Sequence, residues 1–227
     1  MSAERSPQEV VEHNRAFFDG PFGRVYSFYM EREWLARVIA RVVWGSDARP
    51  LYSSMSVVGE IPSGATIVDA PCGAGVAFRA LEPDQDVRYV AVDVSRAMVE
   101  RARSRAEDLG LDQIEFVEGD ATQIPLGDGA ADLFLSYFGL HCFPDPAGAV
   151  GEIARILRPG GRVVGGSIVR TIELRHRLLI RPYTGGFGPV GDTADLSRWL
   201  ESAGIDAEIE VRGAFAYFHG VRTPFSS

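Results

Sequence analysis

The feature that most constrains the fold is a regular alternation of short β-rich runs and amphipathic stretches between residues 64 and 220. Several of the β-rich runs are apolar throughout, as strands buried on both faces are. The runs expected to form strands are 66–68, 87–92, 114–117, 131–136, 162–169, 207–211 and 214–218. The stretches expected to form helices between them are 95–109, 146–157 and 192–203. Such alternation predicts an α/β, doubly wound Rossmann-like fold, with a mostly parallel seven-stranded sheet and helices on both faces.

The first 60 residues have a different texture, helical and rich in aromatic side chains. A capping box at 6–9 predicts a first helix, which Gly20-Pro21 is expected to stop. A second helix is expected over 30–44 and a third over 50–58. The second carries an apolar stripe that should pack against the rest of the chain, formed by Trp34, Leu35, Val38, Ile39, Val42 and Val43.

We therefore expect a helical region over residues 1–60 and an α/β domain over 61–222. An insertion is expected at 170–192, and 223–227 is expected to form a flexible tail. A chain of 227 residues suits one large domain of this kind.

Charge and composition exclude several functions. The net charge of −8 argues against nucleic acid or an anionic membrane as the main partner. All 23 basic residues are arginine, which excludes lysine Schiff-base chemistry and a P-loop lysine. There is no run long enough for a membrane span and no secretory signal, and two cysteines make neither a disulfide framework nor a zinc site. We expect a cytoplasmic protein without a metal, as a monomer or a homodimer.

The turn after the first expected strand carries the strongest chemical signal. The strand ends in Asp69, and Gly73 and Gly75 flank one small residue before a helix is expected to begin. Glycines there let the backbone approach a ligand closely. Asp93 closes the next strand 18 residues after Gly75, where an acid can accept hydrogen bonds from ribose hydroxyls. The pattern predicts a nucleoside-containing cofactor, and Phe78, at a position that a dinucleotide fingerprint fills with a small residue, disfavours NAD or FAD.

Four segments together carry a family resemblance: VDAPCGAG, the acid in AVDVS, EGDATQIPLGDGAADLFLS and ARILRPGGRVV. In this order and spacing they resemble class I S-adenosylmethionine-dependent methyltransferases, in particular the small-molecule group that resembles ubiquinone/menaquinone-biosynthesis enzymes. The resemblance covers about residues 64–170 and implies S-adenosyl-L-methionine as cofactor, with S-adenosyl-L-homocysteine as product. The cofactor-binding residues that it implies are Asp69, Ala70, Gly73, Gly75, Asp93, Val94, Met98, Asp120, Ala121 and Ser136.

The same resemblance implies roles for three acids. Asp69 would organise the glycine turn and contact the methionine amino group, Asp93 would hold the ribose, and Asp120 would accept from the adenine amine. Asp120 can also be interpreted as the cap of a turn. The chain departs from the family at Pro71, where glycine is usual, so one backbone donor to the cofactor is lost.

On the acceptor side, His141 and Tyr137 follow the fourth expected strand and are the candidate catalytic residues. His141 is either a general base or a brace for its loop, and Tyr137 either orients the acceptor or belongs to the core. The resemblance also implies that residues 1–60 and the insertion at 170–192 form a lid over a catalytic domain at 61–222. Aromatic residues of this lid predict a pocket for a small apolar or aromatic acceptor, and the expected substrate contacts are Tyr26, Tyr29, Tyr183 and Phe187.

We therefore expect a methyltransferase that acts by in-line displacement on an oxygen, carbon or nitrogen of a small molecule. The asparagine- or aspartate-Pro-Pro-aromatic run of amino-methylating nucleic-acid enzymes is missing after the fourth expected strand. Two alternatives stay open: an isomerase or cyclase that uses the cofactor for positioning only, and a non-catalytic binder.

Overall fold

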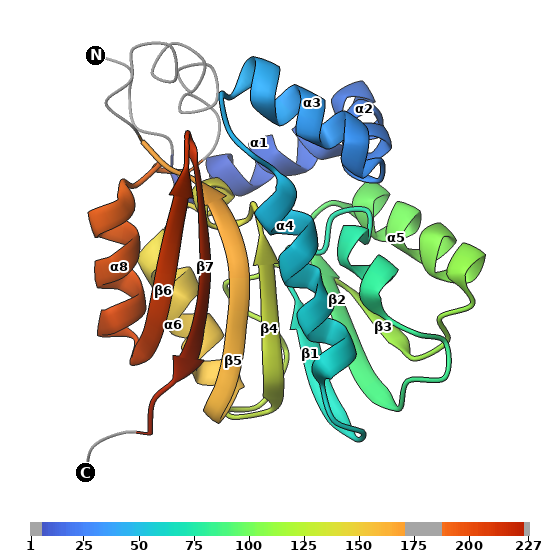
Figure 1. The fold of residues 1–227 in the computed structure, drawn as a ribbon, viewed down its shortest axis with the longest axis vertical. Helices are drawn as coiled ribbons and strands as arrows, with labels where there is room; N and C mark the ends of the chain where they lie inside the picture. The colour runs from blue at the N-terminus through green and yellow to red at the C-terminus, as the bar shows by residue number, and fades with distance from the viewer. Residues whose placement is uncertain (1–5, 171–187, 225–227) are drawn as a thin grey trace.

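The computed structural model describes residues 6–170 and 188–224 and contains the expected seven-stranded sheet (Figure 1). The strands are β1 (Ala65–Asp69), β2 (Val87–Asp93), β3 (Ile114–Glu118), β4 (Ala131–Tyr137), β5 (Leu157–Ile168), β6 (Ile205–Arg212) and β7 (Phe215–Arg222). Their order in the sheet is β3-β2-β1-β4-β5-β7-β6. Neighbouring strands are parallel, except that β7 runs antiparallel to both β5 and β6. The predicted doubly wound α/β fold is confirmed.

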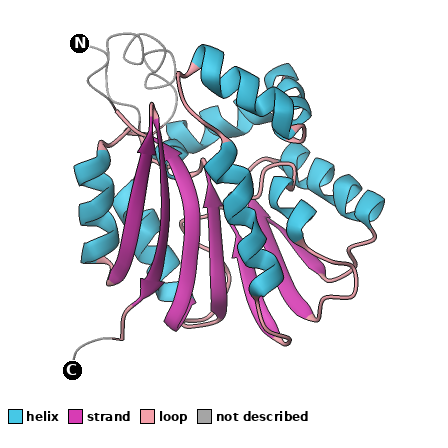
Figure 2. Cartoon of the chain, viewed as in Figure 1, coloured by secondary structure: helices cyan, strands magenta, loops and turns pink. Residues whose placement is uncertain are grey.

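Helices cover both faces of the sheet (Figure 2). One face packs against α4 (Arg49–Ser54), η1 (Met55–Glu60), η2 (Val76–Ala80) and α5 (Arg96–Leu109), and the other against α6 (Pro146–Ile156) and α8 (Thr193–Ser202). Successive residues of a strand point to opposite faces, so Tyr89 of β2 belongs to the first core and Val90 to the second. Two apolar cores therefore hold the sheet rigid beneath its carboxyl edge.

Three helices form the lid across the carboxyl ends of the central strands: α1 (Pro7–Asp19), α2 (Pro21–Met30) and α3 (Glu33–Val43). A short turn, η3 (Leu140–Cys142), follows β4 beneath them. The capping box at the start of α1 is confirmed, since Ser6 Oγ accepts from the Glu9 N–H and Glu9 Oε2 accepts from the Ser6 N–H. The expected helix over 30–44 is α3, which begins three residues later at Glu33, and α2 before it was not expected. Pro21 stops α1 but is also the first residue of α2, because proline is tolerated where the N–H has no helical partner.

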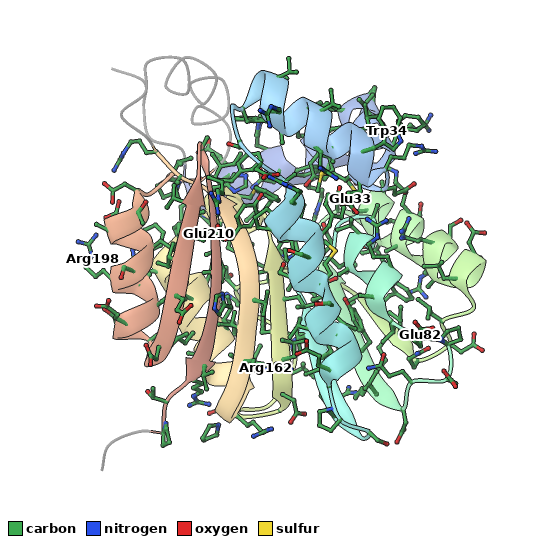
Figure 3. All side chains as sticks on the ribbon, viewed as in Figure 1. Glu33, Trp34, Glu82, Arg162, Arg198 and Glu210 are labelled. Carbon is green, nitrogen blue, oxygen red and sulfur yellow. The ribbon has the colours of Figure 1, made fainter. Side chains whose placement is uncertain are left out.

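The apolar stripe expected on the second helix is only partly buried. In α3 the inward ridge consists of Ala36 and Ala40, continued by Trp44 just after the helix. Trp34, Val38, Val42 and Val43 are between 41% and 77% exposed, and Figure 3 shows Trp34 on the outer side of the lid. The expectation that these four side chains pack inward was therefore wrong. The small alanines let the helix backbone approach its neighbours closely. With the alanine side of α3 turned inward, the larger apolar side chains point outward.

The helix expected after the glycine turn is only the short 3₁₀ segment η2. Gly75 begins it with φ +74°, and a Cβ at this residue would lie 2.4 Å from Cε2 of Phe78. Phe78 is fully buried under the turn, with its ring 5.3 Å from that of Tyr89. The bulky ring thus supports the glycine turn from below. No helix in the described part of the chain has the length and apolarity to cross a bilayer.

Candidate active site

A cavity of about 1030 Å³ lies at the carboxyl edge of the sheet beneath the lid, and it is open to solvent. Nine of the expected site residues line it: Tyr26, Asp69, Gly73, Asp93, Val94, Met98, Asp120, Ala121 and Tyr137. Three expected cofactor contacts are not among its lining residues: Ala70, Gly75 and Ser136. Gly75 supports the cavity indirectly, through the shape of the loop. The Ser136 hydroxyl is fully buried, close to the point where Gly139 meets Pro71.

Asp93 fixes the glycine turn. Its Oδ2 accepts from the Gly73 N–H at 2.9 Å and its Oδ1 accepts from the Ser95 N–H at 2.9 Å. Burial raises the pKa of this carboxyl to about 6, against the lowering effect of the two backbone donors. Each carboxylate oxygen can still accept a further hydrogen bond. The hydrogen bond that organises the turn thus comes from Asp93, whereas this role was expected of Asp69.

Asp69 lies at the end of β1, and its Oδ2 accepts from the Tyr89 hydroxyl at 2.9 Å. Burial raises the pKa of Asp69 to about 7, the tyrosine donor lowers it, and the nearby Asp93 carboxyl raises it further. Sequence analysis missed Tyr89 because a tyrosine within an apolar strand looks like core. The pairing of an acid at the end of one strand with a tyrosine inside the adjacent strand would have been visible only from the register of β1 and β2.

Asp120 has both of the features considered for it. Its Oδ1 accepts from the N–H and from the hydroxyl of Thr122, both at 2.8 Å, as a turn-capping aspartate does. Asp120 and Ala121 also line the cavity. The turn therefore presents both residues to whatever ligand the cavity holds.

The cavity is rich in acidic side chains. Glu31, Asp69, Asp93 and Asp120 line it, and none of its described lining residues is an arginine or a histidine. Asn14 of α1 lines it too, although sequence analysis treated that helix only as a cover. A ligand with positive charge and hydrogen-bond donors is favoured here, and a pyrophosphate is disfavoured.

Pro71 and Gly139 are matched to one another. Both lie at the carboxyl edge, one after β1 and one after β4. A Cβ at Gly139 would lie 2.2 Å from Cδ of Pro71, so the proline ring fits only because position 139 has no side chain. The departure from the family at Pro71 is thus accommodated within this chain by a second residue.

A second, apolar cavity of about 680 Å³ adjoins the first. Tyr26 and Tyr29, both expected to contact substrate, line it together with the inward ridge of α3. Tyr183 and Phe187 lie outside the described residues. The described lining residues include no aspartate, glutamate, arginine or lysine. The side chains that line both cavities are Phe18, Tyr26, Met30, Phe138 and Cys142.

The two candidate catalytic residues lie in different cavities. Tyr137 lines the acid-rich cavity, with its hydroxyl 3.1 Å from Ser54 Oγ, and burial raises its pKa well above the ordinary value. His141 lines the apolar cavity, and its Nδ1 accepts from the Ile168 N–H at 3.3 Å. Burial lowers the pKa of His141 to about 4. The ring is therefore neutral at pH 7 and, with Nδ1 accepting, carries its proton on Nε2.

Within residues 6–170 and 188–224, no group of three or more His, Cys, Asp and Glu side chains is placed to hold a metal ion. Cys72 and Cys142 are both buried as free thiols, and burial raises the pKa of each above its ordinary value. Neither thiol therefore has the character of an activated nucleophile.

Comparison with known proteins agrees with this geometry. Residues 68–165 match the family model of a methyltransferase domain. A demethylmenaquinone methyltransferase of Oceanobacillus iheyensis is 32% identical over 166 residues, which cover 72% of this chain and 64% of that protein. A ubiquinone/menaquinone biosynthesis C-methyltransferase of Methylobacterium nodulans is 39% identical over 98 residues, which cover 42% of this chain and 39% of that protein.

A solved structure supports the fold. Phosphoethanolamine N-methyltransferase 2 of Haemonchus contortus, in complex with S-adenosyl-L-methionine, superposes with a TM-score of 0.71 at 15% identity, covering 92% of this chain and 60% of that one. The chain spans at most 64% of the length of the curated relatives cited above. Residues 68–165 thus match a methyltransferase domain, and the chain is similar to the quinone-biosynthesis methyltransferases among the class I S-adenosylmethionine-dependent enzymes.

Proposed function

We propose that the protein binds S-adenosyl-L-methionine in the acid-rich cavity and methylates a small apolar or aromatic molecule held in the adjoining apolar cavity. The observation that carries this proposal is the junction of the two cavities. An acidic compartment suited to a cation shares five side chains with an apolar compartment that has no charged group among its described lining residues. In this proposal α1, α2 and α3 act as the lid over a catalytic domain at 61–222, whereas α4 and η1, which the expected lid over 1–60 included, pack on the sheet of that domain.

The residues of the first cavity fit the cofactor. Asp93 keeps acceptor capacity for the ribose hydroxyls while it holds the Gly73 N–H, and Asp69 lies beside the same turn as a partner for the ammonium group. Asp120 and Ala121 present a turn to the adenine. When bound, the cofactor supplies an electrophilic methyl group on a positively charged sulfur. The acidic lining favours that charge and disfavours the pyrophosphate of NAD.

The chain's own contribution to the reaction is alignment and the exclusion of water. Methyl transfer by in-line displacement needs an acceptor atom about 3 Å from the methyl carbon and a dry pocket. The aromatic rings of α2 provide such a wall, with the Tyr26 and Tyr29 rings 5.3 Å apart. Phe138, at φ +56°, lines both cavities, and its ring lies 4.8 Å from that of Phe215.

His141 is proposed to brace its loop and to serve as a hydrogen-bond donor, and the general-base role is not part of the proposal. Its Nδ1 already accepts from the Ile168 N–H, and burial holds its pKa at about 4. A ring in this state has its proton on Nε2, so neither nitrogen is available to take a proton from the acceptor.

The test has two stages. Isothermal titration calorimetry should detect S-adenosyl-L-methionine and S-adenosyl-L-homocysteine but not NAD⁺. Mass spectrometry should then detect a gain of about 14 daltons on a lipophilic phenol or quinol, because a methyl group replaces a proton. Conversion without a mass change would support the use of the cofactor for positioning only, and tight binding without turnover on any acceptor would support a binder. Absence of heat with both adenosyl compounds would overturn the proposal.

A further inference from the structure

Asn14, on the inner side of the lid helix α1, has an amide whose orientation is fixed. The side chain is 6% exposed and lines the acid-rich cavity. Its Nδ2 donates to the backbone carbonyl of Cys142 at 2.7 Å. A carbonyl only accepts, so the amide atom beside it must be the nitrogen, and the oxygen must point the other way.

The amide oxygen is left without a partner. Asn14 Oδ1 is buried and accepts no hydrogen bond from any described residue. Buried polar atoms are nearly always hydrogen-bonded in folded proteins, and an unpaired acceptor in the wall of a cavity therefore indicates a ligand group. The neighbouring lining residues on the same helix, Val11 and Phe18, are apolar and supply no donor.

We propose that Asn14 binds the cofactor directly, with Oδ1 accepting a hydrogen bond from an N–H or O–H group of the ligand. This inference rests on the proposed function, because it takes the cofactor to be the ligand of the acid-rich cavity. S-adenosyl-L-methionine carries such donors on its ammonium group, its ribose and its adenine. The lid then forms part of the cofactor site.

The tie to Cys142 gives this contact a second effect. Cys142 lies in the loop after β4 and lines both cavities, and the hydrogen bond joins residues 128 positions apart in the sequence. A ligand held by Oδ1 is therefore connected through one amide group to the wall of the acceptor pocket. Asn14 acts as a positioning residue for that wall as well as a binding residue.

Arg15 offers a matched control on the same helix. Its Nε donates to the backbone carbonyl of Val94 at 3.1 Å, so it also ties α1 to the carboxyl edge of the sheet. Arg15 is exposed and does not line the cavity. Arg15→Ala removes a hydrogen bond between α1 and the sheet edge but leaves the cavity lining unchanged. Asn14→Leu removes the hydrogen bond to Cys142 and also the acceptor oxygen of the cavity.

The experiment measures dissociation constants by calorimetry for S-adenosyl-L-homocysteine and for 5′-methylthioadenosine, which lacks the amino-acid part. Asn14→Leu should weaken binding of S-adenosyl-L-homocysteine about tenfold, as expected for one lost hydrogen bond at a buried acceptor. Arg15→Ala should change it less than about twofold. An equal loss for 5′-methylthioadenosine assigns the donor to the adenosine, and a loss confined to S-adenosyl-L-homocysteine assigns it to the ammonium; both outcomes support the inference.

A second variant separates the acceptor from the tie. Asn14→Asp keeps an oxygen in the cavity and loses the donor to Cys142, so it should bind within about threefold of the wild type. A loss as large as that of Asn14→Leu would overturn the inference, and so would equal losses in Arg15→Ala and Asn14→Leu. Unchanged binding in Asn14→Leu would show that water satisfies the oxygen and would also overturn it. Wild-type protein that binds neither compound would overturn the proposed function as well.

Discussion

Asp69→Asn should make the stability of the ligand-free protein less dependent on pH. Burial raises the pKa of Asp69 from 3.8 to about 7, so between these values the folded protein binds more protons than the unfolded chain. The free energy of unfolding therefore falls as pH rises through that window and is level above it. At about 1.4 kcal/mol for each pH unit, the fall due to Asp69 is roughly 4 kcal/mol between pH 4 and pH 7.

The variant has no carboxyl to titrate at this position. The oxygen of the introduced amide can still accept from Tyr89, but the two new N–H groups need partners, at a cost of about 1–3 kcal/mol. Asp69→Asn should thus be less stable than the wild type at pH 4 and equal or more stable at pH 8. It should also bind S-adenosyl-L-methionine more weakly at both.

The assay is urea unfolding of both ligand-free proteins at pH values half a unit apart, with tryptophan fluorescence as the probe of unfolding. Only the difference between the two curves is interpreted, because carboxyl groups away from Asp69 titrate equally in both, and the nearby Asp93 is the one whose titration should also shift. A difference that stays constant with pH, or that changes in the opposite direction, would refute the reasoning. Tyr89→Phe is the companion variant: loss of the hydroxyl donor should raise the pKa of Asp69 further and move the window upward.

Three further predictions follow from contacts described above. Gly75→Ala should lower the free energy of unfolding by about 2–5 kcal/mol in urea titrations, because the new Cβ would clash with Phe78 and the backbone would be strained. Gly73 also has a positive φ, but no atom lies within 4 Å of where its Cβ would be, so Gly73→Ala should lower it by only about 1–2 kcal/mol. His141→Asn should keep kcat within about threefold of the wild type, and kcat of the wild type should show no inflection near pH 6.5. A hundredfold loss of kcat in this variant would instead indicate that His141 is a general base. Trp34→Ser should change the free energy of unfolding by less than about 0.5 kcal/mol and Trp44→Ala by about 3–5 kcal/mol. Similar losses in the two variants would contradict the assignment of Trp34 to the exposed side and Trp44 to the buried side.

The sheet was predictable because each strand is a short apolar run bounded by turn residues. All seven expected strands exist, with ends within a few residues except for the start of β5 and the end of β7. The meeting of three acids in one cavity was predictable too, since Asp69 and Asp93 end strands and Asp120 follows one at the same edge of the sheet. Local sequence signals are strong where backbone geometry alone decides the structure.

The lid was less predictable. Pro21 was interpreted as a stop, although it also starts a helix, and the stripe on α3 was assigned to the wrong side. Periodicity cannot tell which of two apolar faces turns inward when small residues permit closer packing than large ones. The roles of Tyr89 and Asn14 depend on partners 20 and 128 positions away, which no local pattern reveals.

The inward ridge of α3 has an implication for how this scaffold can diversify. Ala36 and Ala40 border the apolar cavity with the smallest chiral side chains, so its width is set by how near the helix backbone lies. Enlarging either alanine would narrow the chamber one methylene at a time while the solvent side of the same helix stays unaltered. Substitutions at these two positions could thereby change which molecules fit the apolar cavity, while the acid-rich cavity stays the same.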